Sequence, residues 1–99
     1  MIIVVGTALA RPEHAPAVLS LSLAHCRRSR AEEGCIDHTV AVDQETPNLF
    51  RFVEYWRDVE ALKMHFAVPA SREFIGTMTP MLAEPAAMKV YQADEANLG

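Results

Sequence analysis

The chain has 99 residues, a length that fits one domain with a single modest core. Its net charge of −4, from 13 acidic and 9 basic residues, gives little support to binding of nucleic acid or of an anionic membrane. Hydrophobic residues make up 51% of the chain, slightly above the usual share, and a buried subunit interface would account for the excess.

The sequence predicts a cytoplasmic protein. No stretch approaches the length of about 18 apolar residues that a membrane-spanning helix needs. The apolar segment Met1–Ala10 lacks a basic start and a cleavage-site context, so it reads as a strand and not as a signal peptide. The two cysteines, Cys26 and Cys35, have neither CxxC nor zinc-site spacing, and we expect two free thiols in a reducing compartment.

The first two predicted elements are a strand at 2–9 and a helix at about 14–32. The strand is a β-branched run that is apolar on both faces. Pro12 or Pro16 suits the first turn of the helix, and Gly34 suits its end. At helical spacing, one face of this helix carries Ala15, Val18, Leu19, Ser22, Leu23 and Cys26.

Two further strands are predicted at 35–42 and 49–56, joined by a turn at 44–48 into an antiparallel hairpin. Alternation places Ile36, His38, Val40 and Val42 on one face of the first. In the second, one face carries Phe50, Phe52, Glu54 and Trp56. Its other face also holds large apolar side chains, among them Val53 and Tyr55. We expect both faces of this strand to be covered, one of them by a second subunit.

The last third of the chain predicts two helices and a strand. Asp58 is a good N-cap for a helix that ends at Pro69, with an apolar stripe of Val59, Leu62 and Phe66 and with His65 on its flank. A helix at about 70–82 follows, with Phe74, Ile75, Met78 and Met81 or Leu82 on one face. The final strand is expected at about 88–93, and the polar segment 94–99 reads as a tail.

The predicted order is β-α-β-β-α-β in one domain, residues 1–99, with a core at about 2–93. This order is typical of an α+β protein with the ferredoxin-like split βαβ fold, whose antiparallel sheet carries helices on one face. The other face needs shielding, which favours a homodimer.

Candidate catalytic residues gather where the 49–56 strand meets the following helix. No phosphate-loop, dinucleotide, serine-hydrolase or zincin motif occurs. What remains are Glu54, Trp56 and His65, with His38 as a further candidate; a histidine suits proton transfer at neutral pH. Aromatic residues suit a pocket for an aromatic substrate, and they are Phe52, Trp56, Phe66 and Phe74.

Each of these residues also has a purely structural interpretation. Trp56 can simply fill the core, and His38 and His65 can be ordinary hydrogen-bonded histidines. A buried Glu54 needs a partner, and Arg57, Lys63 or a backbone N–H group could supply it.

The sequence resembles the antibiotic biosynthesis monooxygenase (ABM) domain over about residues 2–93. The resemblance rests on Ser29–Ile36 with its E-x-G-C element, on Phe50-x-Phe52-x-Glu54-x-Trp56, and on Ala61-Leu62-x-x-His65 with Phe74. It implies a dimeric α+β barrel and oxidation of a quinol-like or polyphenolic aromatic with O₂, without flavin, metal or haem.

On the matching positions, the resemblance implies that Trp56 walls the pocket, that His65 binds or deprotonates the substrate, and that Glu54 orients a neighbour or acts as a base. His38, Phe52, Phe66 and Phe74 are then expected to bind substrate.

The sequence departs from the family pattern at several positions. His38 stands where the family often has Tyr, and Ala70 where it often has a second His. The strand at 2–9 lacks the Asn of the haem-degrading branch, which argues against haem degradation. The pattern is also similar to an isomerase of phosphorylated autoinducer-2. The alternatives are therefore an enolising isomerase acting on a small oxygenated metabolite and a non-enzymatic small-ligand-binding dimer.

Overall fold

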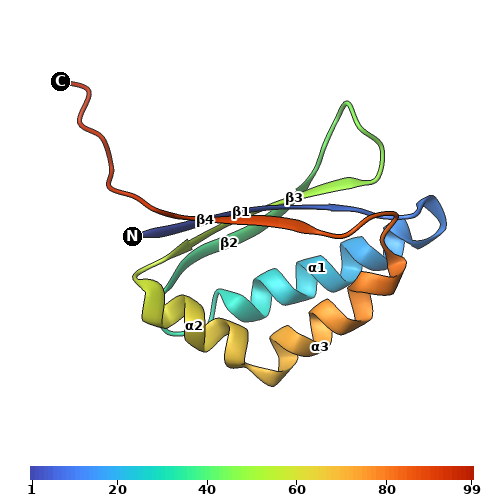
Figure 1. Cartoon of the computed structure of the whole chain (residues 1–99), viewed down its shortest axis with the longest axis horizontal. Helices are drawn as coiled ribbons and strands as arrows, with labels where there is room; N and C mark the ends of the chain where they lie inside the picture. The colour runs from blue at the N-terminus through green and yellow to red at the C-terminus, as the bar shows by residue number, and fades with distance from the viewer.

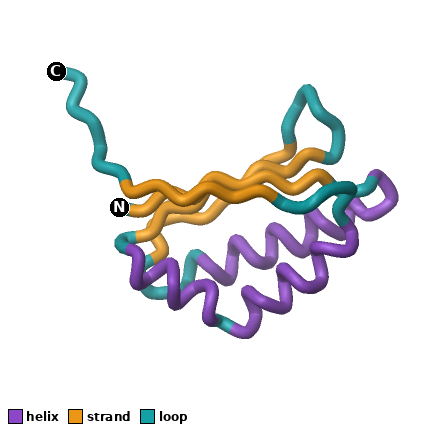
Figure 2. Tube along the Cα trace, in the orientation of Figure 1, coloured by secondary structure: helices purple, strands orange, loops and turns teal.

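The computed structural model describes all residues from Met1 to Gly99. The chain runs through β1 (Ile2–Leu9), α1 (Ala15–Ser29), β2 (Cys35–Val42), β3 (Leu49–Trp56), α2 (Val59–Ala67), α3 (Pro69–Met78) and β4 (Ala87–Gln92), with short 3₁₀ helices η1 (Pro12–His14) and η2 (Thr79–Met81). The strands form one antiparallel sheet in the order β2-β3-β1-β4, and the helices cover one face of it (Figures 1 and 2). The α+β ferredoxin-like split βαβ fold is confirmed.

β1 is a central strand because it pairs on both sides. It lies against β3 in a register that runs from Ile2 opposite Trp56 to Leu9 opposite Leu49, and β4 lies along its other edge. The β-branched, apolar sequence of β1 suits this position. The strand ranges expected from the sequence agree with the structure to within about one residue.

The core consists of two apolar clusters on the covered face of the sheet. The larger lies between the sheet, α1 and α3, and includes Phe52 of β3. The smaller lies against α2 and includes Trp56 of the same strand. Between these two residues on the same face of β3 is Glu54, which is also buried. A polar seam therefore separates the two clusters.

α1 ends three residues earlier than expected, at Ser29, and a turn follows at residues 30–34. Gly34 closes this turn with a φ of +83°, a conformation that favours glycine. A Cβ atom at this position would lie 2.5 Å from Cβ of Ala61 in α2. The absence of a side chain thus lets the turn approach α2 closely.

The expected apolar stripe of α2 is correct for Leu62 but wrong for its other two residues. Val59 and Phe66 are exposed, and the buried residues are Ala61, Leu62 and His65. The expected N-cap is correct, because Asp58 accepts a hydrogen bond from the backbone N–H of Ala61. The close contact of Ala61 with the Gly34 turn sets the rotation of the helix, and His65 consequently lies on the buried face and not on the flank.

Two other predicted faces also differ. A register shift between Cys35 and Asp37 leaves Ile36 59% exposed, while His38 is buried toward the helices. α3 spans 69–78 and not 70–82, because the chain tightens into η2 around Pro80. Ile75 of α3 is exposed, whereas Phe74 and Met78 are buried.

The face of the sheet opposite the helices is open. Val5 and Tyr91 are exposed there, and the loop between β2 and β3 and the C-terminal tail both project from this side (Figure 1). None of the helices is long and apolar enough to cross a membrane.

Candidate active site

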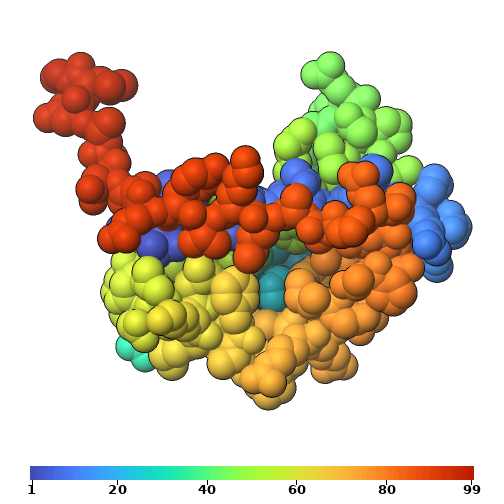
Figure 3. Space-filling model, in the orientation of Figure 1, coloured from blue at the N-terminus to red at the C-terminus, as the bar shows by residue number.

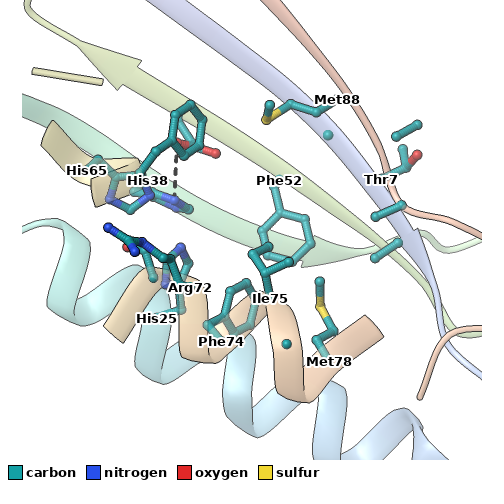
Figure 4. A pocket seen from close by; sticks show the side chains of 18 residues that line it. Thr7, His25, His38, Phe52, His65, Arg72, Phe74, Ile75, Met78 and Met88 are labelled. Atoms are coloured by element: carbon teal, nitrogen blue, oxygen red, sulfur yellow. Dashed lines mark ion pairs between the residues drawn. The ribbon is translucent and has the colours of Figure 1, made fainter. Parts of the chain in front are cut away.

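A cavity of about 410 Å³ lies between the sheet and the three helices. Figure 3 shows the hollow between α2 and α3, beneath β4. His25, His38, His65 and Arg72 gather at one end of the cavity, with Glu54 beside His38, and Ser71 also lines the cavity (Figure 4). The other end is mostly apolar, with Phe52, Ile75, Met78 and Met88 beside Thr7 (Figure 4). The cavity is therefore shaped for a ligand with an apolar body and an oxygenated end.

Three histidines from three different elements meet at the polar end. His25 comes from α1, His38 from β2 and His65 from α2, and all three are buried. Their ring centroids are 5.0 to 5.6 Å apart. The ring of His25 also stacks on that of Phe74, with centroids 4.1 Å apart and an angle of 7° between the planes.

His65 is paired with Glu32, which lies in the turn after α1. Nδ1 of His65 is 2.8 Å from Oε1 of Glu32. Because a carboxylate accepts only, Nδ1 carries a hydrogen, and in the neutral ring of this tautomer the lone pair lies on Nε2. This pairing orients His65 as a proton acceptor.

His38 lies between Cys26 and Glu54. Its Nδ1 is 3.3 Å from Sγ of Cys26, and its Nε2 is 3.3 Å from Oε1 of Glu54 (dashed line in Figure 4). The second contact is close but lacks hydrogen-bond geometry, so Nε2 is a buried nitrogen without a hydrogen bond. Burial and the nearby His65 lower the pKa of His38 to about 4, and the ring is neutral at neutral pH.

Glu54 has its hydrogen-bond partner two residues away on the same strand. The indole Nε1–H of Trp56 donates to Oε1 of Glu54 at 2.9 Å, so neither Arg57 nor Lys63 is needed for this purpose. Burial raises the pKa of Glu54, while the Trp56 hydrogen bond opposes that rise.

His25 has the opposite hydrogen-bonding character to His65. Arg28, one turn further along α1, donates from Nη2 to Nδ1 of His25. A guanidinium cannot accept, so Nδ1 is the bare nitrogen and Nε2 carries the hydrogen. Burial and the neighbouring His38 lower the pKa of His25 to about 3. His25 is thus a neutral hydrogen-bond donor.

Most of the residues expected at the site line the cavity. They are His38, Phe52, Glu54, His65, Phe66 and Phe74. Trp56 does not: it is 0% exposed, lies behind the cavity in the smaller apolar cluster, and uses its N–H group on Glu54. The pocket role expected for Trp56 is therefore replaced by an indirect one.

Sequence reasoning missed His25, Glu32, Ser71 and Arg72. His25 could have been found, because it shares a helical face with Val18, Ser22 and Ser29 and is buried with them. Glu32 begins the E-x-G-C element of the family resemblance, but its place in a turn gave no signal that it pairs with His65.

Comparison with known proteins identifies a matching protein family. The family model described as "Antibiotic biosynthesis monooxygenase" matches residues 1–77. An uncharacterized protein of Synechocystis sp. is 35% identical over 94 residues, which are 95% of this chain and 64% of that protein. The chain thus spans less than two thirds of this relative.

Solved structures are similar over nearly the whole chain. A Deinococcus radiodurans protein, named as a candidate antibiotic biosynthesis monooxygenase, has a TM-score of 0.92 and 28% identity, with 98% of this chain and 96% of that one covered. The Pseudomonas aeruginosa protein PA3566 has a TM-score of 0.85 and 26% identity, with 95% and 94% covered.

Proposed function

Because the chain belongs to the antibiotic biosynthesis monooxygenase family, we propose that it is a cofactor-independent monooxygenase that oxidises a quinol-like or polyphenolic aromatic with O₂. The observation that carries this proposal is the pairing of His65 with Glu32 at the polar end of an aromatic-walled cavity. It supplies a proton acceptor where the hydroxyl group of such a substrate would lie.

Binding of the aromatic body follows from the apolar walls. Phe52 and Phe74 have ring centroids 6.4 Å apart at 66°, an edge-to-face pair beside which a further ring can pack. Met78 and Met88 line the same end and adapt to irregular shapes. The substrate's hydroxyl group then points toward the histidines.

Deprotonation is assigned to His65. Its Nε2 accepts the phenolic proton, and the Glu32 carboxylate stabilises the imidazolium that forms. The resulting phenolate is an electron-rich ring that can reduce O₂ directly. One oxygen atom is inserted at a ring carbon and the other leaves as water, and the substrate supplies all four electrons, so quinol plus O₂ gives hydroxyquinone plus water.

Hydrogen-bond donors near His65 stabilise the negative charge on the substrate oxygen. His25 offers Nε2–H, and the exposed Arg72 lines the same end of the cavity. Glu54 is held by Trp56 and faces His38, so we assign it the role of orienting His38. Trp56 is then a positioning residue.

The test is oxygen uptake by purified, chelator-treated protein with a panel of hydroquinones and polyphenols. We expect His65→Ala to reduce kcat/KM about 100-fold or more, because general-base catalysis contributes roughly that much. His14→Ala, which alters the one histidine outside the cavity, is the matched control and should leave the rate unchanged. No uptake with any phenol in the panel would refute the proposal.

The same pairing also favours a second candidate, an isomerase or other enolising enzyme acting on a small oxygenated metabolite. A proton acceptor such as His65 can remove a proton from carbon next to a carbonyl group. Proton exchange into a dicarbonyl compound under anaerobic conditions would identify this activity. Ligand binding without turnover in either assay would instead indicate a binding protein.

We also propose that two copies pack through their open sheet faces into a dimeric α+β barrel in the cytoplasm. The open face carries the exposed Val5 and Tyr91 beside the half-buried Val53 and Tyr55, an apolar surface that a second copy would cover. The two free cysteines fit a reducing compartment. Light scattering at micromolar concentration should give twice the chain mass, and a monomer mass would contradict the dimer.

A further inference from the structure

We propose that His25, His38 and His65 together bind a divalent transition-metal ion, with zinc as the best match. This inference goes beyond the proposed oxygenase reaction, which uses no metal. One ligand nitrogen from each of the three rings lies within 4.8 Å of the other two. Imidazole is a common ligand for zinc, and three histidines with one open position form a recurrent zinc site.

The spacing requires only side-chain adjustment. Zinc–nitrogen bonds of about 2.0–2.1 Å place the ligands of a tetrahedral ion about 3.3 Å from one another. The three nitrogens therefore need to approach by at most about 1.5 Å, a movement that three side chains can share. The cavity beside them leaves room for a water molecule or a substrate oxygen as the fourth ligand.

The groups around the rings are also suitable. A histidine binds metal through an unprotonated ring nitrogen. The carboxylates of Glu32 and Glu54 lie against His65 and His38 and offset the charge of the ion.

Two of the rings have contacts typical of metal ligands. His65 donates from Nδ1 to Glu32, the arrangement by which a carboxylate commonly orients a zinc-bound histidine through its other nitrogen. Nε2 of His38 is buried without a hydrogen bond, and Nδ1 of the same ring contacts Sγ of Cys26. A metal ion would give this buried nitrogen a partner.

Arg28 opposes binding at the third ring. While its guanidinium donates to Nδ1 of His25, that lone pair is occupied and the ring hydrogen lies on Nε2, so neither nitrogen is free for a metal. Metal binding therefore requires Arg28 to withdraw. Arg28 is half-buried and lies near the end of α1. The residue at position 28 should thus strongly influence the affinity for the metal ion.

The experiment titrates tag-free, chelator-stripped protein with Zn²⁺ by calorimetry and with Co²⁺ by visible absorption. We expect one ion per chain and the intense bands of tetrahedral Co²⁺. His25→Gln, His38→Gln and His65→Gln should each weaken binding at least tenfold, while His14→Gln should not change it. Cys35→Ser should also leave the affinity unchanged, which excludes the Cys35 thiol as a ligand.

Arg28→Met provides a test that a folding defect cannot imitate. Without the competing donor, a ring nitrogen of His25 is free to bind the ion, and the affinity for Zn²⁺ should rise about tenfold. The inference is overturned by the absence of 1:1 binding, by affinities that the three His→Gln changes do not alter, or by unchanged or weaker binding in Arg28→Met. Oxygen uptake in the presence of chelator tests the oxygenase proposal separately, and its failure would leave these binding results intact.

Discussion

Phe52 and Glu54 are neighbours on the covered face of β3 and are almost equally buried, with 8% and 7% exposure, but they are held in different ways. Phe52 belongs to an apolar cluster in which packing is non-directional and one apolar group can replace another. Glu54 depends on an N–H group from Trp56 and faces one nitrogen of His38. Burial follows from alternation along the strand, whereas the chemistry depends on specific partners, one on the same strand and one on β2.

The largest effect should come from Trp56, which belongs to both regions. Trp56→Ala removes the largest fully buried side chain and also leaves Glu54 without its donor. We expect a loss of about 3–5 kcal/mol in the free energy of unfolding, measured by urea denaturation. Trp56→Phe keeps most of the volume and should cost only about 1–3 kcal/mol. Equal losses for the two variants would show that the lost volume contributes nothing, and an unchanged Trp56→Phe would show that the hydrogen bond contributes nothing.

Acid should destabilise the packing around the buried His25 and His38 without affecting the two apolar clusters directly. The folded-state pKa values of His25 and His38 are lowered to about 3 and about 4, below the ordinary value of 6.5. At pH values between these pKa values and 6.5, the unfolded chain binds more protons than the folded chain does. The contribution of the two histidines to the unfolding free energy is therefore fully present above pH 6.5 and is lost as the pH falls toward 3. We expect about 2–4 kcal/mol of loss at 1.36 kcal/mol per pKa unit, discounted for local relaxation.

The acid effect has its own control. Glu54 acts in the opposite sense, because its raised pKa favours the folded, protonated form as the pH falls. The slope of the unfolding free energy against pH therefore reports the histidine contribution minus that of Glu54. His25→Gln should make this slope smaller. An unfolding free energy that is constant from pH 7 to pH 4 would contradict the prediction.

A smaller and purely chemical effect is expected at Glu32. Glu32→Gln keeps a hydrogen-bond acceptor for Nδ1 of His65 but removes the charge that stabilises the imidazolium. Oxygen uptake should fall about 10- to 100-fold, with little change in the urea midpoint. Its exposed neighbour gives the matched variant, Glu33→Gln, which should retain the full rate.

The smallest effect concerns the rim of the cavity. Phe66 lines the cavity but is 43% exposed, so Phe66→Ala should lower the unfolding free energy by less than about 1 kcal/mol. KM for the aromatic substrate should nevertheless rise several-fold, because a cavity wall is lost. Met64→Ala, on the same helix but away from the cavity, should change neither quantity. Similar KM values for the two variants would remove Phe66 from the binding site.

The sequence allowed the strands to be predicted more reliably than the packing of the helices. β1 and β3 carry their own signal in β-branched runs and alternation, and their bounds were found correctly. The buried face of α2 was wrong because a contact between Ala61 and Gly34, 27 positions apart, decides it. Local periodicity does not contain that information.

The candidate site was predictable to the extent that its residues lie on regular elements. His38 and Glu54 share a face with apolar neighbours, so burial could be inferred for both. The pairing of Glu32 with His65 could not, because Glu32 lies in a turn that follows no period. The three-histidine cluster joins three elements and has no linear motif for the same reason.

The turn at residues 30–34 has a consequence for behaviour on heating. The proton acceptor and its carboxylate belong to segments 33 residues apart, and the Gly34 turn holds them together where it touches α2. A turn of this kind opens locally at a lower free energy than the sheet does. The proposed oxygenase activity should therefore decline at temperatures where the sheet is still folded, and this segment would set the upper temperature at which the site stays assembled.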